Sequence, residues 1–312
     1  METDDQVSSP MQSTATGRHG PCHPGTQGRN ALADRGKPPV RRWGRKSWLG
    51  LILFVLLAAG TGWGLQRRPL LLPPDEGEDP AAILASAETD PDQFEFVWTR
   101  LMYDSPGYQF ARNNNSWTTD YPKADKQFLQ GMLRYTKLHA SRKELVLRPD
   151  DPELLKHPFV YAVEVGYLKL SDQEAAHLRE YLLRGGFLVV DDFHGTREWA
   201  NFEQQMKKVF PDRPIRDVPL SDPIFHCLFD IQELFQVPGL QFLYTGRIFE
   251  KDGYNARYAG IYDDKGRIMV MINFNQDLGD AWEWADLAAY PLRYTSQAYQ
   301  LGSNYIIYSL TH

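Results

Sequence analysis

The feature that most constrains the fold of this chain is a short apolar run that ends abruptly in charged residues. Four apolar residues, Phe187 to Val190, two of them β-branched, are typical of a strand buried on both faces of a parallel sheet. Asp191, Asp192 and His194 follow almost at once. In open α/β sheets, ligands bind just beyond the carboxyl ends of the strands. The segment therefore predicts an α/β fold and a candidate site at one edge of its sheet.

Strand-like and helix-like segments alternate through the last two thirds of the chain. The expected strands are 94–98, 145–147, 159–163, 187–190, 258–262 and 268–274, and the expected helices are 124–137, 171–183, 197–209 and 296–310. Ser171 and Glu174 have the spacing of a capping box, which marks a helix start. The turn 263–266 suits a hairpin between the last two strands. This alternation predicts a parallel sheet with helices on both faces.

The beginning of the chain has a different composition and divides into three segments before the folded domain. Residues 1–46 lack apolar periodicity and end in a basic cluster, which predicts a disordered cytoplasmic tail. Residues 47–66 are almost uniformly apolar and predict one transmembrane helix, with a cleaved signal peptide or a buried soluble helix as alternatives. Residues 67–92 form a linker rich in proline and acidic residues, and the α/β domain is expected over 93–312.

Charge predicts how this anchor is oriented. Residues 1–68 hold 10 Lys and Arg against 4 Asp and Glu, which leaves 24 against 36 for 69–312, so the net charges are +6 and −12. Basic residues tend to stay on the cytoplasmic side, which predicts a cytoplasmic N-terminus and an exported C-terminal domain. An acidic exported domain is a poor candidate for nucleic-acid binding. Cys22 and Cys227 would then lie on opposite sides of the membrane, which excludes a disulfide between them.

The candidate catalytic residues are the three that follow the diagnostic strand. Asp191 or Asp192 could act as a general base with His194 as its partner, or the three could bind a divalent metal. The alternative is that one Asp caps the following helix and that His194 is a partly exposed loop residue. Only three possible metal ligands are local, so we predict no metal site. No cofactor is predicted either, because the chain lacks a glycine-rich phosphate loop and a dinucleotide fingerprint.

A second set of polar and aromatic residues is expected to line the same crevice and bind the ligand. Its members are Arg100, Tyr103, Trp117, Asp120, Tyr121 and Asn273. Each has a structural alternative. Arg100 could form an internal ion pair with Asp120, Asp191 or Asp192, and Asp120 could be the N-cap of the helix that starts near residue 123. The aromatic residues could cover the core, and the polar run that begins at Asn273 could serve a turn.

Three segments together resemble a known bacterial family. They are Trp117–Pro122, Gly185–Gly195 and Tyr290–Tyr305, and they resemble the domain of unknown function 4159 family over roughly residue 94 to the C-terminus. The resemblance implies a flavodoxin-like sheet similar to that of class I glutamine amidotransferases, and attachment to the bacterial inner membrane. In the amidotransferase pattern a nucleophilic Cys follows a central strand. Here Asp192-Phe193-His194 stands there, so cysteine amidotransferase activity is not expected.

Three hypotheses of function follow from these features. The leading one is an exported domain, attached to the bilayer through 47–66, that binds a small polar ligand or serves a cell-envelope complex without being an enzyme. The alternative is a hydrolase acting on carbohydrate or an amide through Asp191 or Asp192 and His194. A third is an interaction module, which would present an exposed aromatic patch around Trp282 and Trp284.

Overall fold

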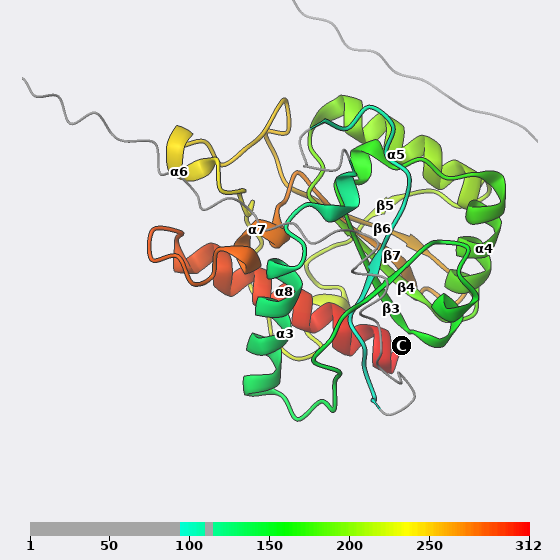
Figure 1. Cartoon of the computed structure of the whole chain (residues 1–312), viewed down its shortest axis with the longest axis horizontal. Helices are drawn as coiled ribbons and strands as arrows, with labels where there is room; N and C mark the ends of the chain where they lie inside the picture. The colour runs from blue at the N-terminus through cyan, green and yellow to red at the C-terminus, as the bar shows by residue number, and fades with distance from the viewer. Residues whose placement is uncertain (1–93, 110–114) are drawn as a thin grey trace, which may run out of the picture. The chain divides into compact units, whose positions relative to one another are not determined.

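A sheet of seven strands forms the centre of the computed structural model, which describes residues 94–109 and 115–312 (Figure 1). The strands are β1 (Thr99–Leu101), β2 (Leu145–Leu147), β3 (Phe159–Val163), β4 (Phe187–Asp191), β5 (Arg216–Asp217), β6 (Arg257–Tyr262) and β7 (Ile268–Phe274). Their order is β2-β1-β3-β4-β7-β6-β5. The first five in this order run parallel, whereas β6 is antiparallel to both β7 and β5. The five parallel strands therefore present their carboxyl ends along one edge.

Helices cover both faces of this sheet, as the alternation of segments predicts. The α-helices are α3 (Lys123–Tyr135), α4 (Asp172–Leu183), α5 (Gly195–Val209), α6 (Phe242–Thr245), α7 (Leu278–Glu283) and α8 (Leu292–Thr311). Short 3-10 turns are η2 (Ser116–Thr118), η3 (Pro152–Lys156), η4 (Val165–Tyr167) and η5 (Pro223–Phe225). Helices α4 and α5 lie against one face, and α3, α7 and α8 against the other (Figure 1). The predicted α/β class is confirmed.

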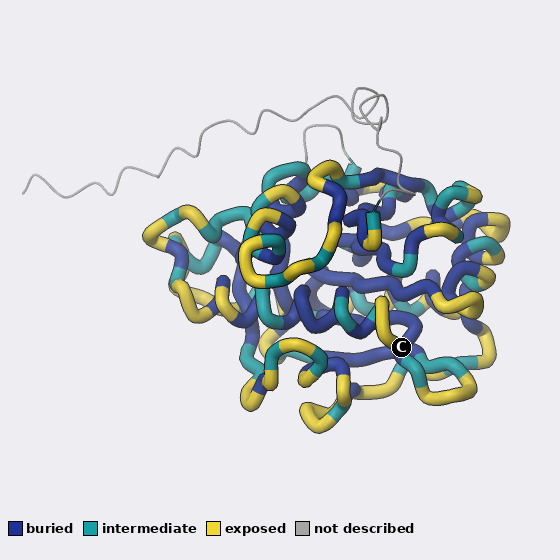
Figure 2. The backbone as a smooth tube through the Cα atoms, turned by 90° about the horizontal axis from the view of Figure 1, so that it is seen from below, coloured by how far each residue is buried: buried dark blue, intermediate teal, exposed yellow. Residues whose placement is uncertain are grey.

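The apolar run Phe187–Val190 is buried on both faces of the sheet. In β4, Leu188 and Val190 belong to the core under α4 and α5, whereas Phe187 and Val189 belong to the core under α3 and α8. Successive side chains of a strand point to opposite faces, so a continuous apolar run is what a doubly covered strand requires. Figure 2 shows this buried centre, with the exposed chain confined to outer turns and helix faces.

The local signals at α4 are also confirmed. The Ser171 hydroxyl accepts a hydrogen bond from the Glu174 amide, and the Glu174 carboxylate accepts one from the Ser171 amide, so the capping box is complete. The helix ends at Leu183 and Gly185 then has a φ of 113°, a backbone conformation that glycine adopts without cost. The chain is thereby turned directly into β4.

Two sequence predictions about the fold need correction. The strand expected at 94–98 lies instead at Thr99–Leu101, so Arg100 is within a strand and not beyond its end. Phe96 forms only an isolated parallel bridge with Ala140, because the aromatic alternation of this segment reflects burial and not a regular ladder. Trp282 is 1 % exposed and packs against Phe128, so it does not belong to the exposed aromatic patch expected around Trp282 and Trp284; Trp284 is half-buried, with the Lys123 ammonium 4.1 Å from its ring centroid.

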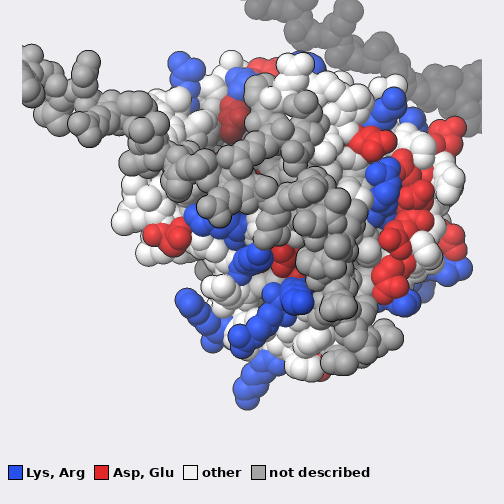
Figure 3. Space-filling model, in the orientation of Figure 1, with Lys and Arg blue, Asp and Glu red and all other residues white. Residues whose placement is uncertain are grey.

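Residues 1–92 lie outside the part of the chain that the structure describes, so the tail, the transmembrane helix and the linker expected there stay predictions. Across residues 94–109 and 115–312, no helix combines the length and the apolar character needed to cross a membrane. Charge on the described surface is mixed: Figure 3 shows Lys and Arg side chains gathered over α3 and both signs interleaved on the right-hand side.

Candidate functional site

Three adjacent parallel strands end in the same unusual way. Glu164 follows β3, Asp192 follows β4 and Asn275 follows β7, and each has a left-handed backbone with φ of 52°, 50° and 59°. Among the described residues, the other non-glycine positions with positive φ are Asp120 at 62° and Lys251 at 51°. Left-handed backbone is uncommon for residues with a Cβ, and such residues gather at functional sites. Here they gather at the carboxyl edge of the sheet, where ligands bind in α/β folds.

Backbone hydrogen bonds explain why these turns take this shape. The Asp192 amide donates to the Gln276 carbonyl over 3.1 Å, and the Asn275 amide donates to the Phe193 carbonyl over 3.0 Å. The Glu164 amide donates to the carbonyl of Asp192 over 3.1 Å. The turns after β3, β4 and β7 are therefore tied to one another, so their side chains are held in fixed positions.

Asp192 and His194 form a buried pair at the centre of this edge. His194 Nε2 lies 3.2 Å from Asp192 Oδ1, and the two side chains are 3 % and 8 % exposed. When Asp192 is ionised its carboxylate only accepts, so Nε2 then carries the proton; Nδ1 has no hydrogen-bond partner among the described residues. The His194 amide donates to Glu198 over 2.7 Å, and Glu198 in turn pairs with Lys251. The predicted catalytic partners Asp192 and His194 are thus in contact.

Burial shifts the pKa values of Asp192 and His194 in opposite directions. Burial first, and then the nearby Asp280 carboxylate, raise the pKa of Asp192 to about 7, against the opposing effect of Lys251. Burial lowers the pKa of His194, so the imidazole is neutral at pH 7. A carboxyl group and a neutral imidazole in contact can exchange protons with a ligand in this pH range.

Asp191 is more deeply held than its neighbour. Its Oδ2 accepts hydrogen bonds from the Tyr161 hydroxyl over 2.9 Å and from the amides of Leu278 and Gly279 over 2.8 and 3.2 Å. The residue is 0 % exposed and its Oδ1 has no partner among the described residues. Burial and Asp192 raise the pKa of Asp191 to about 8. Asp191 therefore supports the start of α7 and has little access to a substrate.

The prediction that Asp191 or Asp192 caps the helix after β4 is wrong, because neither side chain accepts an amide of α5. The first amides of α5 bind other segments: Gly195 donates to Asn275 Oδ1 over 2.9 Å, and Thr196 donates to Asp252 Oδ1 over 3.0 Å. Asp191 instead accepts the amides of Leu278 and Gly279 in the first turn of α7, a helix distant in sequence whose N-cap is Asp277. Helix α5 is therefore positioned by Asn275, which follows β7, and by Asp252, which precedes β6.

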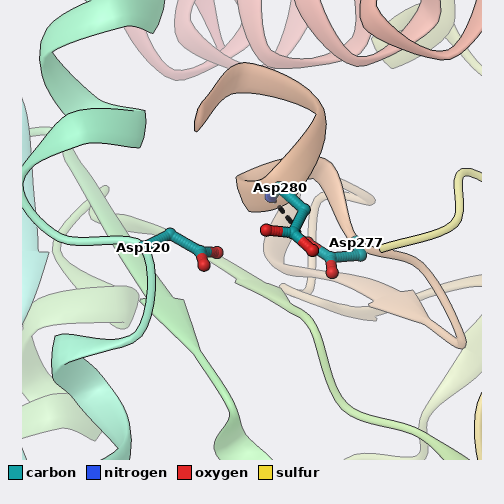
Figure 4. A group of neighbouring side chains, drawn as sticks. All are labelled: Asp120, Asp277 and Asp280. Carbon is teal, nitrogen blue, oxygen red and sulfur yellow. Dashed lines mark hydrogen bonds between the residues drawn. The ribbon is translucent and has the colours of Figure 1, made fainter. Parts of the chain in front are cut away.

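A second acidic cluster, which we call the acidic triad, consists of Asp120, Asp277 and Asp280 (Figure 4). One carboxylate oxygen of each lies within 4.8 Å of the other two. Asp120 comes from the turn before α3, whereas Asp277 and Asp280 come from the start of α7, and the three carboxylates point toward one another. The alternative that Asp120 is the N-cap of α3 is wrong, because Pro122 occupies that position.

The triad is held in place but not neutralised. Asp277 Oδ1 accepts the Asp280 amide over 2.7 Å, and Asp280 Oδ1 accepts the Trp284 indole N–H over 3.0 Å. Asp120 Oδ2 is inaccessible to solvent and has no hydrogen-bond partner among the described residues. Burial, followed by the neighbouring carboxylates, raises the pKa of Asp120 and of Asp277 well above the usual range.

Arg100 does not face the crevice with free donors. It is 0 % exposed and forms a bidentate ion pair with Asp125 of α3 over 2.9 and 2.6 Å. Its remaining donors reach the carbonyls of Trp117 and Thr119, each over 3.0 Å. The internal pairing weighed for Arg100 is therefore present, although the partner is Asp125 and none of the three carboxylates that were considered.

The other predicted ligand-binding residues have structural roles in the described chain. Tyr103 donates to the Val163 carbonyl, and Trp117 and Tyr121 are 2 % and 6 % exposed and pack on each other at 6.1 Å between ring centroids. Asn273 is 0 % exposed, and its Oδ1 accepts the Tyr305 hydroxyl over 2.8 Å. Of the predicted set, Asp120 alone points an unpartnered carboxylate oxygen into the site.

Six further charged residues at this edge are not among the predicted site residues. They are Glu164, Glu198, Glu250, Lys251, Asp277 and Asp280. Glu164 follows a predicted strand and Asp277 belongs to the polar run after β7, so their position relative to the strand ends is the only sequence signal for them. Glu250 and Lys251 come from a long irregular stretch between β5 and β6, and only the tertiary fold brings them to Asp192.

Comparison with known proteins supports the resemblance of the three sequence segments. Over 80 residues, the chain is 30 % identical to Sialidase B of Streptococcus pneumoniae, a match that covers 24 % of this chain and 11 % of that protein. The chain thus spans about a ninth of the length of this relative. A family model described as Domain of unknown function (DUF4159) matches residues 100–310, which include the whole parallel sheet except Thr99 and every residue of the site. The chain therefore belongs to the DUF4159 family.

Proposed function

We propose that this protein is a single-pass protein of the bacterial inner membrane, whose exported domain binds a small polar ligand at the carboxyl edge of the sheet. Residues 47–66 would span the bilayer with the N-terminus in the cytoplasm. The finer fold we propose is flavodoxin-like and similar to the class I glutamine amidotransferases. The order β2-β1-β3-β4-β7 of the parallel strands supports this, because it matches the flavodoxin order 2-1-3-4-5 when β7 counts as the fifth strand.

One observation carries the proposal. All five non-glycine residues with positive φ in the described chain lie at this edge, and four of them bear polar or acidic side chains. Acceptor oxygens of Asp120, Glu164 and Asp192 predominate there, with Lys251 as a charged donor. A ligand that fits such a site offers donors, so hydroxyl or ammonium groups are the expected chemistry.

Cysteine amidotransferase chemistry is not part of this proposal. The residue just beyond the central strand β4 is Asp192, where the amidotransferase pattern has its nucleophile. Cys227 lies beside η5, and its thiol donates to the Pro223 carbonyl over 3.2 Å. Burial raises the pKa of Cys227 to about 11, so its thiol is not ionised at neutral pH.

The test is ligand binding by the full-length protein in detergent, with thermal stability as the readout. A panel of polyols, sugars and amines should contain compounds that raise the Tm of the wild type, because a ligand that binds the native state stabilises it. Asp192→Asn should abolish the increase, and Asp264→Asn should retain it, because Asp264 is exposed at the opposite end of β7. Equal responses of both variants would reject this site.

The second candidate is a hydrolase that acts on carbohydrate or an amide. The contact between Asp192 and His194, with the pKa of Asp192 raised to about 7, favours it. In this reading Asp192 is the general base for a water molecule and His194 its partner. Hydrolysis of model glycosides or amides should be lost in Asp192→Asn and reduced in His194→Gln. Unchanged rates in both would exclude this mechanism.

A role in a cell-envelope complex is compatible with either candidate. Co-purification of the full-length protein after cross-linking in cells should recover the same envelope proteins with the wild type and with Asp264→Asn. Recovery of no partner would leave ligand binding as the proposed function and remove the complex from it.

A further inference from the structure

We infer that the acidic triad of Asp120, Asp277 and Asp280 binds a hard divalent cation of the Mg²⁺ or Mn²⁺ type. This inference deepens the proposed function, because the cation would lie at the same edge of the sheet as the polar ligand. It departs from the sequence prediction of no metal site, which considered only ligands close together in the chain. The triad joins residues separated by more than 150 positions.

The spacing of the triad oxygens suits a small divalent cation. Six-coordinate Mg²⁺ and Mn²⁺ sites use oxygen ligands about 2.1 Å from the metal, which places pairs of ligand oxygens about 3–4 Å apart. The three triad oxygens all lie within 4.8 Å of one another and point toward a common centre (Figure 4). Small side-chain rotations therefore suffice to bring all three to a shared cation.

One carboxylate oxygen of the triad is buried without a hydrogen-bond partner among the described residues. The Asp120 carboxylate points toward the other two carboxylates, and its Oδ2 is inaccessible to solvent and has no hydrogen-bond partner among the described residues. The fully buried Asp191 lies at the same turn, because its Oδ2 binds the amides of Leu278 and Gly279, and its Oδ1 is also unpartnered. Burial without a partner disfavours the charged form of a carboxyl group, and a bound cation stabilises that form.

The residues around the triad orient its carboxylates without supplying a positive charge. Ligating carboxylates are usually oriented by further hydrogen bonds, and Asp277 and Asp280 are each oriented in this way by α7. The basic group that acts on Asp120 is Arg100, which is already bonded to Asp125. Within the described chain, the triad therefore has orienting donors but no cation of its own.

Gly279 explains how Asp120 approaches α7 so closely. A Cβ at this position would lie 2.2 Å from Asp120 Oδ2, far inside van der Waals contact. Glycine is therefore required for the Asp120 carboxylate to reach the first turn of α7, and Gly279→Ala should displace it from the triad.

The experiment is a titration of EDTA-treated full-length protein in detergent with MnCl₂, followed by the loss of the free Mn²⁺ signal in electron paramagnetic resonance. The wild type should bind Mn²⁺ saturably, and its Tm should rise by about 5–10 °C at a hundredfold excess over the Kd. Asp120→Asn and Asp277→Asn should each weaken binding at least tenfold, whereas Asp264→Asn should bind as the wild type does. Competition by MgCl₂ should restore the free signal.

Folding of the variants is checked independently. Replacing a carboxylate by an amide in this repulsive cluster should leave the Tm of the metal-free protein unchanged or higher, so lost binding cannot be ascribed to unfolding. Absence of saturable Mn²⁺ binding in the wild type, or wild-type binding in both triad variants, would overturn the inference. If Mn²⁺ does not bind but polar ligands still raise the Tm in EDTA, the proposed function stands without the cation. If Mn²⁺ binds but no polar ligand raises the Tm, the cation site stands and the proposed function fails.

Discussion

Replacing Asp192 by Asn should stabilise the metal-free protein at alkaline pH and leave its stability at acidic pH nearly unchanged. The pKa of Asp192 is 3.8 in the unfolded chain and about 7 in the folded protein. At about 1.4 kcal/mol per pKa unit, the ionised carboxylate costs the folded state about 4 kcal/mol above pH 7. Asparagine keeps an oxygen that accepts from His194 but carries no charge, so the variant avoids this cost.

The sign of the pH dependence follows from proton binding. Between pH 4 and pH 7 the folded protein binds the proton of Asp192 whereas the unfolded chain has released it. Stability of the wild type therefore falls as pH rises through this window and levels off above it. Asp191, whose pKa is raised to about 8, adds to the fall in the same direction. Proteins whose carboxylates are ion-paired in the fold show the opposite dependence, because their stability falls as the pH is lowered.

Urea unfolding of the full-length protein in EDTA, at pH 5 and at pH 8, measures this effect. The wild type should be less stable at pH 8 than at pH 5, and Asp192→Asn should be the more stable of the two proteins at pH 8 by about 1–4 kcal/mol. Asp264→Asn, at an exposed turn, should follow the wild type at both pH values. A wild type that gains stability from pH 5 to pH 8, or a variant destabilised at pH 8, would refute the reasoning.

Three further variants test the framework around the site. Glu174→Gln should lower the free energy of unfolding in urea by about 1 kcal/mol above pH 5, because the capping box loses its charged carboxylate. The pKa of Glu174 is lowered in the fold, so the difference between variant and wild type should shrink as pH falls through that pKa. Arg100→Met should cost about 3–5 kcal/mol by stranding the buried Asp125, and the double change with Asp125→Leu should recover most of it; no recovery would show that the pair is not the cause. Trp282→Ala should cost about 3–5 kcal/mol, and a change below about 1 kcal/mol would contradict its place in the core.

Much of the fold could be predicted from the sequence because its signals are local. The apolar run of β4, the capping box at Ser171 and the hairpin before Ile268 each depend on neighbouring residues, and each is present as predicted. The first strand was misplaced because aromatic residues such as Phe96 are buried beside the sheet without joining a regular ladder. Burial and strand pairing leave the same alternation in a sequence.

The site was predictable only in part, for a related reason. The position of Asp192 and His194 followed from the rule about strand ends, and their contact is confirmed. Asp277 follows the end of β7 within the polar run that begins at Asn273, whereas Asp280 and Lys251 reach the same edge only through the packing of α7 and the loop before β6, which no periodicity reveals. The sequence also does not show that the guanidinium donors of Arg100 are already bonded to Asp125 within the fold.

The most direct test of an acidic, cation-binding edge is an anomalous difference map from crystals of the protein grown with MnCl₂. The account predicts one strong peak between the carboxylates of Asp120, Asp277 and Asp280, within about 2.2 Å of an oxygen of each. A map without a peak at this edge, or with Mn²⁺ bound only at exposed surface carboxylates, would contradict it.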